Sequence, residues 1–352
     1  MKKMRILESN VFYTTFAIVI GFIIGAIFLM SVGISPLQAY GKLASGIFGK
    51  PKFLVWTLIY AAPLIFTGLS VAFSLRTGVF NIGAEGQFVV GAMAACVCGI
   101  LFKLPPVIHP TVCILAAALA GCAWSYIVGI IKVKRGIHEV LSFIMFNWIA
   151  FYLSNFLVNT ETLHKTGSGE ATKNVLDTAR ILFPSGMLKA LDCMGANWGF
   201  IFAIVAAAGM WIIIEKTTLG YKLKAVGFNK EAATFGGINA NQSILTALGI
   251  SGALAGIGGA VQILGMAGRI SQFAGQEGYG FQGITVALIA GSNPLGCILS
   301  GIFYGAMKYG GAKLTMVGAP EEVIDIIMGC VIIFIAISGI FKSLFMKIDK
   351  KQ

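Results

Sequence analysis

The sequence predicts an all-α fold: a polytopic membrane helical bundle of about ten transmembrane helices, one of which is a half-helix. Of its 352 residues, 57% are hydrophobic and only 11% are charged, whereas soluble domains carry about 25% charged residues. Apolar runs recur from residue 11 to residue 345, and no segment between them is long enough to fold alone. Residues 1–352 are therefore expected to form a single transmembrane domain.

The individual spans follow from the apolar runs, because a hydrocarbon core about 30 Å thick takes about 20 helical residues. The run 281–291 is too short to cross alone and ends at the helix stop Gly291-Ser292-Asn293-Pro294. We interpret it as a half-helix, or as a span that borrows residues from the preceding loop. Ten spans are expected, with nine and eleven as alternatives. They are residues 11–33, 53–74, 85–104, 110–132, 138–158, 197–215, 243–266, 281–291, 294–312 and 322–343.

Lysine and arginine lie mostly in the short segments between apolar runs, where they report orientation through the positive-inside rule. The basic segments 132–135, 216–230 and 342–351 fall on the same side as the basic N-terminus if the spans number ten. This places the protein in the cell membrane with both termini in the cytoplasm. Exceptions on the outer side are Lys42, Lys50 and Lys52. The net charge of +12 is explained in this way, and nucleic acid is not an expected partner.

The first apolar run, 11–33, follows Lys2, Lys3 and Arg5, an order of charges found in signal peptides. It is longer than a signal-peptide core, and no A-x-A cleavage site follows it. We therefore interpret it as a retained first span.

Two polar segments interrupt the apolar pattern for longer than a turn requires, and long loops in compact domains are usually functional. Residues 159–196 form an outer, extracytoplasmic loop, which is either a docking surface for a substrate-delivery protein or a loop without a function of its own. Residues 216–242 form an inner, cytoplasmic loop with helical periodicity.

Several residue patterns that would indicate an enzyme are absent from the sequence. The three histidines are isolated from one another, and the seven cysteines show no metal-ligand spacing. No GxxxxGK[ST] phosphate loop occurs, so the chain cannot hydrolyse ATP through that motif. Residues 278–283 match GxGxxG, but they precede a membrane half-helix rather than follow a strand, and we reject dinucleotide binding. We expect neither a catalytic site nor a metal or cofactor bound by this chain.

Three pairs of glycines four residues apart predict helix faces that allow close packing in a membrane. They are Gly21/Gly25, Gly252/Gly256 and Gly301/Gly305.

Residues 76–87 pack two charges, an amide pair and glycines into the short gap between two apolar runs. Irregular backbone at membrane depth is tolerated only where it is buried in protein or lines a wet cavity, and an ionisable group there indicates a functional site. Glu85 could pair with Arg76, while polar contacts to a solute would come from Asn81 and Gln87. The alternative is a plain structural turn.

A second polar cluster opens the span at residue 138. His138 and Glu139 stand at its cytoplasmic end, where a carboxylate complements a helix N-terminus. Asn147 lies deeper, and a buried amide in a membrane helix needs partners. It either bonds a neighbouring helix or binds the solute.

The inner loop contains the sequence of a short capped helix. Asn229 can cap a helix that begins Lys230-Glu231-Ala232-Ala233, and Gly236-Gly237 can end it. Such a helix on the cytoplasmic side suits docking into a partner's groove. The alternative is an amphipathic connector between two spans, which would have a similar sequence.

Together these segments resemble the permease subunits of ABC importers for nucleosides and simple sugars, most closely the purine-nucleoside branch. The resemblance rests on GVFNIGAEGQ at 78–87, EVLSFIMFNWIA at 139–150, residues 217–236, and residues 278–291 with the following Asn293-Pro294-Leu295-Gly296. It implies a ten-helix importer core and a second permease, paralogous or identical. It also implies an extracytoplasmic binding lipoprotein and cytoplasmic ATPases that use ATP and Mg²⁺.

The resemblance also implies roles for individual residues. Those expected along the substrate pathway or gate are Phe80, Asn81, Glu85, Gln87, Asn147 and Gln282. Those expected to couple the pore to the ATPase are Gly227, Asn229, Glu231, Ala232, Ala233 and Gly236. The sequence departs from the family pattern at His138, Phe143 and Gln282, where Asn, a small polar residue and an acidic residue are expected.

The expected function is import of nucleosides, with purine nucleosides as the expected class, by alternating access driven by the partner ATPases. Phe80 would stack on a base or line the gate. A simple-sugar or branched-chain amino-acid permease is the alternative within the family. An ion-coupled secondary transporter would instead need carboxylates in mid-span, for which only Glu85 is a candidate.

Overall fold

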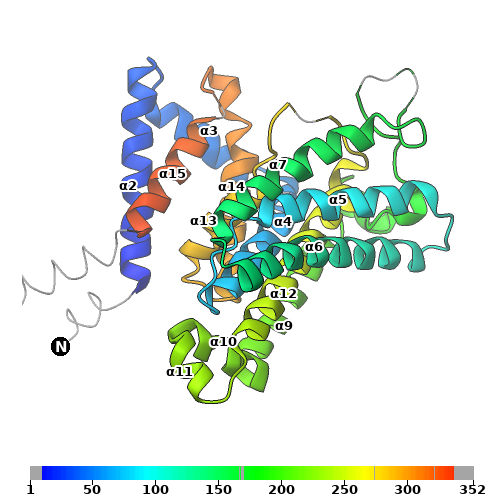
Figure 1. Cartoon of the computed structure of the whole chain (residues 1–352). Coiled ribbons are helices and arrows are strands. Elements are labelled where there is room, and N and C mark those ends of the chain that lie inside the picture. Colours follow the sequence, from blue (N-terminus) through cyan, green and yellow to red (C-terminus); the bar gives the residue numbers. More distant parts are fainter. Residues whose placement is uncertain (1–9, 166, 168–169, 273, 321, 337–352) are drawn as a thin grey trace, which may run out of the picture. The chain divides into compact units, whose positions relative to one another are not determined.

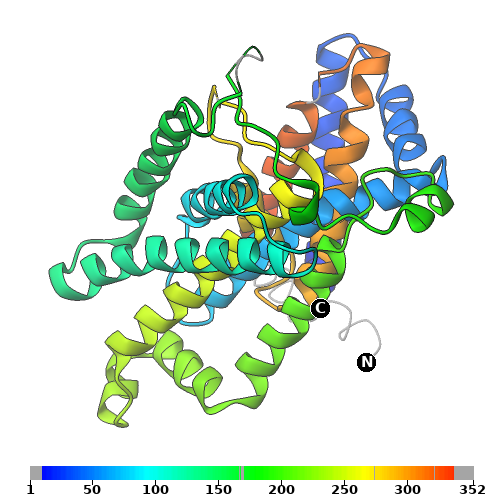
Figure 2. The same cartoon turned by 90° about the vertical axis from the view of Figure 1, so that its right-hand side faces the viewer.

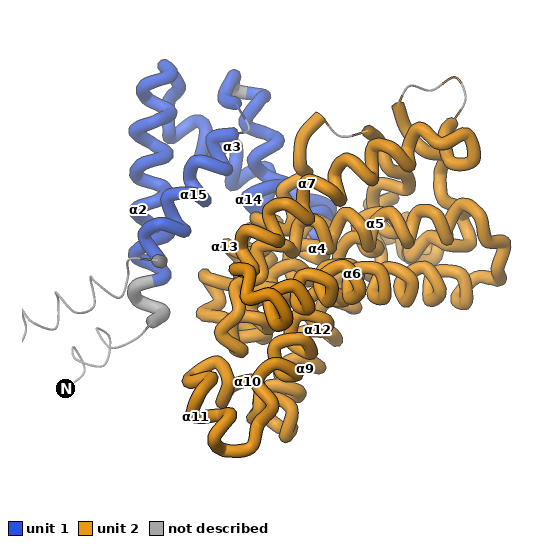
Figure 3. Tube along the Cα trace, in the orientation of Figure 1, with its two compact units in different colours: residues 1–57, 306–352 blue, residues 58–305 orange. Residues whose placement is uncertain are grey.

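A computed structural model describes residues 10–165, 167, 170–272, 274–320 and 322–336 (Figure 1). The described chain is a set of helices, and its extended pairing is limited to three isolated bridges: His164 with Thr172, Ala171 with Ser271, and Leu182 with Asn197. This confirms the predicted all-α class. The described residues divide into two compact units, one of residues 1–57 and 306–352 and one of residues 58–305 (Figure 3).

The first unit contains α2 (Asn10–Ser31), α3 (Pro36–Phe48), the start of α4 (Pro51–Leu75), the end of α14 (Gly296–Gly311), the turn η3 (Leu314–Val317) and α15 (Glu322–Ala336). Helix α2 packs on α15 through one of the predicted glycine pairs. A Cβ atom added at Gly21 or Gly25 would meet Val331 or Ile327. The sequence did not predict α3, an amphipathic helix that buries Leu43 and Ile47.

Three helices form the centre of the second unit: α5 (Ala84–Leu101), α6 (Ile108–Arg135) and α12 (Ala240–Val261). Their backbones touch where glycines meet, because a Cβ atom at Gly121 would meet the backbone of Gly252 and Gly256. The predicted pair Gly252/Gly256 therefore packs as expected. The third pair does so as well, since Gly301 and Gly305 lie against Ile65 and Ala61 of α4.

The remaining elements of this unit are α7 (Glu139–Val158), η1 (Asp177–Ala179), α8 (Ser185–Ala190), α9 (Gly199–Lys216), α10 (Thr218–Phe228), α11 (Lys230–Phe235), the π-helical turn η2 (Gln262–Ala267) and α13 (Tyr279–Ile289). Helices α10 and α11 project together from one end of the unit, and the loop after α7 lies far from them in both views (Figures 1 and 2). That loop is tied down by backbone bonds from Val175 to Gly268 (2.9 Å) and from Leu176 to Gly99 (2.9 Å).

All ten predicted spans coincide with helices, although the end of the last one lies outside the described residues. Among the described residues, seven helices are long and apolar enough to cross a membrane: α2, α4, α5, α6, α7, α9, and α12 together with η2. Helix α13 has 11 residues and is too short to cross alone, as the sequence predicted. The number of crossings, nine to eleven, stays a prediction.

Candidate functional site: the break between α4 and α5

The chain breaks between α4 and α5 at residues 76–83, in the middle of the second unit. Helix α4 ends in tight backbone bonds, from Gly78 to the Leu75 carbonyl (3.0 Å) and from Val79 to the Ser74 carbonyl (3.2 Å). Gly78 adopts a left-handed conformation with φ of 74°, which costs glycine little and other residues more. The segment then turns inward and α5 begins at Ala84.

The predicted amide pair lies at the centre of this break. The Asn81 Nδ2 donates to Gln87 Oε1, and the Gln87 Nε2 donates to Asn81 Oδ1, both at 2.9 Å. The Asn81 amide also reaches Ser251 Oγ on α12 at 2.6 Å and Ser70 Oγ on α4 at 3.2 Å. All four side chains are fully buried. Because every polar group in this cluster has a partner, it joins three helices as one unit.

Glu85 connects α5 to the half-helix α13. Its carboxylate accepts hydrogen bonds from the backbone N–H groups of Gly278 (2.7 Å) and Gly280 (2.6 Å), while only 1% of the residue is exposed. These N–H groups belong to the first turn of α13, which has no partners within its own helix. A buried carboxylate at this position also favours the positive end of the helix dipole.

Glycines allow this contact. Gly278 has φ of 84°, and a Cβ atom at Gly280 would meet the backbone of Ala84 and Glu85. The GxGxxG segment that we rejected as a dinucleotide site therefore lets α13 approach α5 closely. The spacing of the glycines was visible in the sequence, but their partner was not.

Asn147 of α7 likewise forms hydrogen bonds with the backbone at the start of α5. Its Oδ1 accepts from the Gly86 N–H (2.9 Å) and its Nδ2 donates to the Ile82 carbonyl (3.1 Å), with 2% of the residue exposed. The sequence left open whether Asn147 bonds a neighbouring helix or binds the solute. In the structure it bonds a neighbouring helix. At the N-terminal end of α7, Glu139 pairs with Lys132, and His138 caps the helix by accepting from the Val140 N–H at 3.3 Å.

The two other predicted pathway residues, Phe80 and Gln282, are half-buried. Phe80 directly precedes Asn81, and Gln282 lies one turn into α13, where its backbone N–H bonds the Gly278 carbonyl (2.8 Å). The structure thus brings Glu85 and Gln282 to the same end of α13. Among the six predicted pathway residues, Phe80 and Gln282 are the two that are partly exposed, whereas Glu85 is buried.

The suggested pairing of Arg76 with Glu85 is replaced by other contacts. The Arg76 Nε donates to the Ser292 carbonyl at 3.0 Å, at the turn between α13 and α14. Arg76 also borders a hollow of about 340 Å³ together with Lys224 and Gly227 of α10. One end of α13 is therefore bonded to the start of α5 through Glu85, and the turn at its other end is bonded to the break through Arg76.

The predicted short inner helix is present as α11. The Asn229 Oδ1 accepts from the Ala232 N–H at 2.9 Å, and the helix ends at Gly236, whose N–H bonds the Ala232 carbonyl at 2.9 Å. Gly227, Asn229, Glu231, Ala232 and Gly236 are all exposed. Large apolar side chains beside them are exposed too, Phe228 by 88% and Phe235 by 95%, as in a surface that meets a partner.

Two contacts join the inner segment, which consists of α10 and α11 (residues 218–235), to the break. Ala233 is buried in one apolar cluster with Val79 of the break and Phe143 of α7. Gly227 lies directly on the break, because a Cβ atom there would meet the Arg76 carbonyl and would lie 3.1 Å from the Gly78 nitrogen. A movement of α10 and α11 would therefore displace the backbone at residues 76–79, which they contact.

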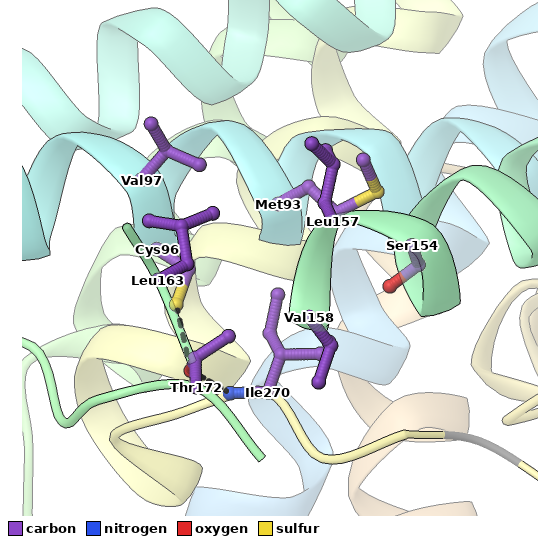
Figure 4. A pocket seen from close by; sticks show the side chains of 9 residues that line it. All are labelled: Met93, Cys96, Val97, Ser154, Leu157, Val158, Leu163, Thr172 and Ile270. Atoms are coloured by element: carbon purple, nitrogen blue, oxygen red, sulfur yellow. Dashed lines mark hydrogen bonds between the residues drawn. The ribbon is translucent and has the colours of Figure 1, made fainter. Parts of the chain in front are cut away.

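A separate small hollow lies between α5, α7 and the loop after α7 (Figure 4). It encloses about 10 Å³ and is lined by Met93, Cys96 and Ser154, among others. Cys96 Sγ lies 3.6 Å from Thr172 Oγ1 at its edge. A volume of this order holds about one water molecule.

Comparisons with known proteins identify relatives over almost the whole chain. The family model described as "Branched-chain amino acid transport system / permease component" matches residues 53–336. The guanosine ABC transporter permease protein NupP of Bacillus subtilis is 36% identical over 97% of this chain and 98% of its own length. The nucleoside ABC transporter permease protein NupB of Lactococcus lactis is 32% identical over 94% of this chain and 92% of its own.

A second guanosine permease of Bacillus subtilis, NupQ, is 28% identical over 71% of this chain and 78% of its own length. No solved structure matches the chain.

Proposed function

Since the chain belongs to the branched-chain amino acid transport permease family, whose relatives here are ABC transporter permeases, we propose that it forms half of the pore of an ATP-driven nucleoside importer. The sequence indicated a resemblance to nucleoside and sugar ABC permeases in residues 76–87 and in the short helix at 229–236, among other segments. This family membership confirms that resemblance. Permease subunits of this family are not themselves enzymes. In the proposed importer, ATP and Mg²⁺ are used by cytoplasmic partner chains.

The contact between Gly227 and the backbone of Arg76 and Gly78 carries the proposal. An importer needs a mechanical path from a cytoplasmic motor to a gate within the membrane. Here α11 offers an exposed docking surface and α10 touches the break. The two ends of α13 are held by Arg76 of the break and by Glu85 in the first turn of α5, which follows the break. A shift of α11 would reposition α13 without breaking the core of α5, α6 and α12.

The gate in this scheme is the half-helix α13 with the break facing it. Asn81, Gln87 and Asn147 hold the shape of the break through buried hydrogen bonds. Phe80 and Gln282, which are partly exposed, would meet the solute. A phenyl ring suits stacking on a base, and an amide can both donate to and accept from the edge of a base.

A second permease completes the pore. NupP and NupQ are two permeases of one organism that are both named for guanosine, and this chain is similar to both. A paralogous pair therefore fits better than a homodimer. A binding lipoprotein would deliver the solute at the outer side, where the loop 159–196 lies if both termini are cytoplasmic.

Uptake assays with labelled guanosine, adenosine, ribose and leucine test the proposed cargo. Cells that carry this chain with its partner subunits should accumulate guanosine or adenosine, and an excess of unlabelled purine nucleoside should compete. Unlabelled ribose and leucine should not compete. Accumulation of ribose or leucine without that of either nucleoside would refute the nucleoside assignment and leave the permease assignment intact.

A further inference from the structure

A groove of about 710 Å³ opens on the second unit at the ends of α6 and α9. Its walls are mostly apolar: Pro110 and Ile114 come from α6, and Trp198 and Phe202 come from α9 or the residue before it. This volume lies in the range of pockets that hold small organic ligands, about 300–1,000 Å³. None of its lining residues belongs to the break or to the inner segment.

The groove lies at the outer boundary of the membrane. Helices α6 and α9 both carry their basic residues at the opposite end, Arg135 and Lys216 among them, and such residues mark the cytoplasmic side. Tryptophan is enriched at the level of the lipid headgroups, where Trp198 would stand. Beyond the groove the same helices expose apolar side chains toward the bilayer, such as Leu119 (70%) and Val205 (65%).

Two charges of opposite sign border the groove on the side of the outer loop. Arg180 is half-buried, and its Nε is buried without a hydrogen-bond partner among the described residues. Its guanidinium packs against Gly268, where a Cβ atom would collide with it. Burial lowers the pKa of Arg180 and the Asp177 carboxylate raises it, but a guanidinium stays protonated in proteins.

Asp177 is exposed on the same rim. Within the described part of the chain, it forms no ion pair with Arg180 at 4.0 Å or less. The groove therefore combines a long apolar wall with a separated cation and anion at one end. A ligand with apolar chains and a zwitterionic head has the matching chemistry.

We propose that this groove binds one phospholipid of the outer leaflet. Its phosphate would meet the Arg180 guanidinium, which pairs well with phosphate oxygens. An amine in the headgroup would meet Asp177, and the acyl chains would follow the apolar faces of α6 and α9. The site is independent of the cargo and of the gate.

Lipid retention by the assembled transporter tests this proposal. The complex is reconstituted in bilayers of phosphatidylethanolamine and phosphatidylglycerol and purified in mild detergent. Native mass spectrometry then counts the phospholipids retained per complex. Arg180→Gln should retain the lipid about tenfold less well, because a hydrogen bond to a charged group is worth at least about 1.4 kcal/mol. Asp177→Asn should lower retention of phosphatidylethanolamine more than that of phosphatidylglycerol.

Arg269→Gln is the matched control, because Arg269 is an exposed arginine near the groove that does not line it. All variants should elute as intact complexes in size-exclusion chromatography, which separates loss of lipid from loss of folding. Equal retention by the Arg180→Gln and Arg269→Gln complexes would overturn the proposal. So would a crosslink from Ile114→Cys to the second permease, because that chain would then cover the groove.

Discussion

At the scale of single residues, buried hydrogen bonds of Asn81, Glu85 and Asn147 hold the break and the start of α5 in place. Thr77 Oγ1 of the break is buried without a partner among the described residues. Glu85 is the most consequential of the three bonded residues, because one side chain satisfies two backbone N–H groups of another helix. Hydrogen bonds to charged groups are worth about 1.5–3 kcal/mol each, and an unpaired carboxylate in the membrane interior would be costly. The sequence predicted a functional role for Glu85, but it did not predict that the carboxylate accepts hydrogen bonds from α13.

Glu85→Gln should therefore impair both stability and transport. The amide has one oxygen in place of two, so one N–H group of α13 loses its acceptor and the amide N–H₂ faces another donor. We expect uptake at least about tenfold lower and a Tm several degrees lower.

Glu161→Gln, an exposed change in the outer loop, should leave both unchanged. Radiolabelled uptake and a thermal unfolding assay on the purified complex measure these effects. Normal uptake and normal Tm in Glu85→Gln would show that the contact with α13 is dispensable.

How much the sequence could predict at this scale depended on distance along the chain. Asn229 was identified as a cap because capping is local, and the structure confirms its bond to Ala232. Asn81 was predicted to offer hydrogen bonds to a solute, but its partners within the protein were not predicted. Two of them lie outside residues 76–87, since Ser251 lies 170 residues away and Ser70 is on the preceding helix. Such partners depend on how α4, α5 and α12 pack, and this packing could not be deduced from the patterns of a single sequence.

At the scale of elements, the molecule combines a short exposed helix with a closely packed helical core. Helix α11 has six residues and exposes most of them, whereas α5, α6 and α12 touch backbone to backbone at their glycines. The contact at Gly227 lies between these two parts. The sequence predicted nearly every helix from apolar length, but it missed α3, because an amphipathic surface helix lacks a continuous apolar run.

Gly227→Ala tests the link between α10 and the break. Its Cβ would meet the Arg76 carbonyl, a backbone atom that cannot move aside cheaply. We expect uptake to fall by about tenfold or more, as in other changes that displace a functional element by about 1 Å. Co-purification with the ATPase should persist, since the docking surface of α11 is untouched.

Gly209→Ala provides the matched control, because Gly209 lies in α9 with no atom within 4 Å of an added Cβ. Uptake and the amount of ATPase recovered with the permease are measured for both variants. If Gly227→Ala transports as well as Gly209→Ala, the contact does not transmit movement.

At the scale of the whole molecule, the apolar body explains the location of the protein and little of its cargo. The interruptions carry the functional information: the break at 76–83, the capped helix α11 and the short helix α13. Each was visible in the sequence as a departure from a continuous apolar pattern. In the proposed importer, the partly exposed Phe80 and Gln282 would contact the cargo. Their roles stay predictions.

We propose that this chain forms half of the pore of an ATP-driven importer, and transport in proteoliposomes tests this claim most directly. Vesicles containing this permease with its second permease and ATPase are supplied with the binding lipoprotein and labelled guanosine, with and without ATP on the ATPase side. Accumulation should require ATP and the ATPase, and it should persist when ion gradients are abolished by ionophores. Accumulation that continues without the ATPase and follows an imposed ion gradient would contradict the account.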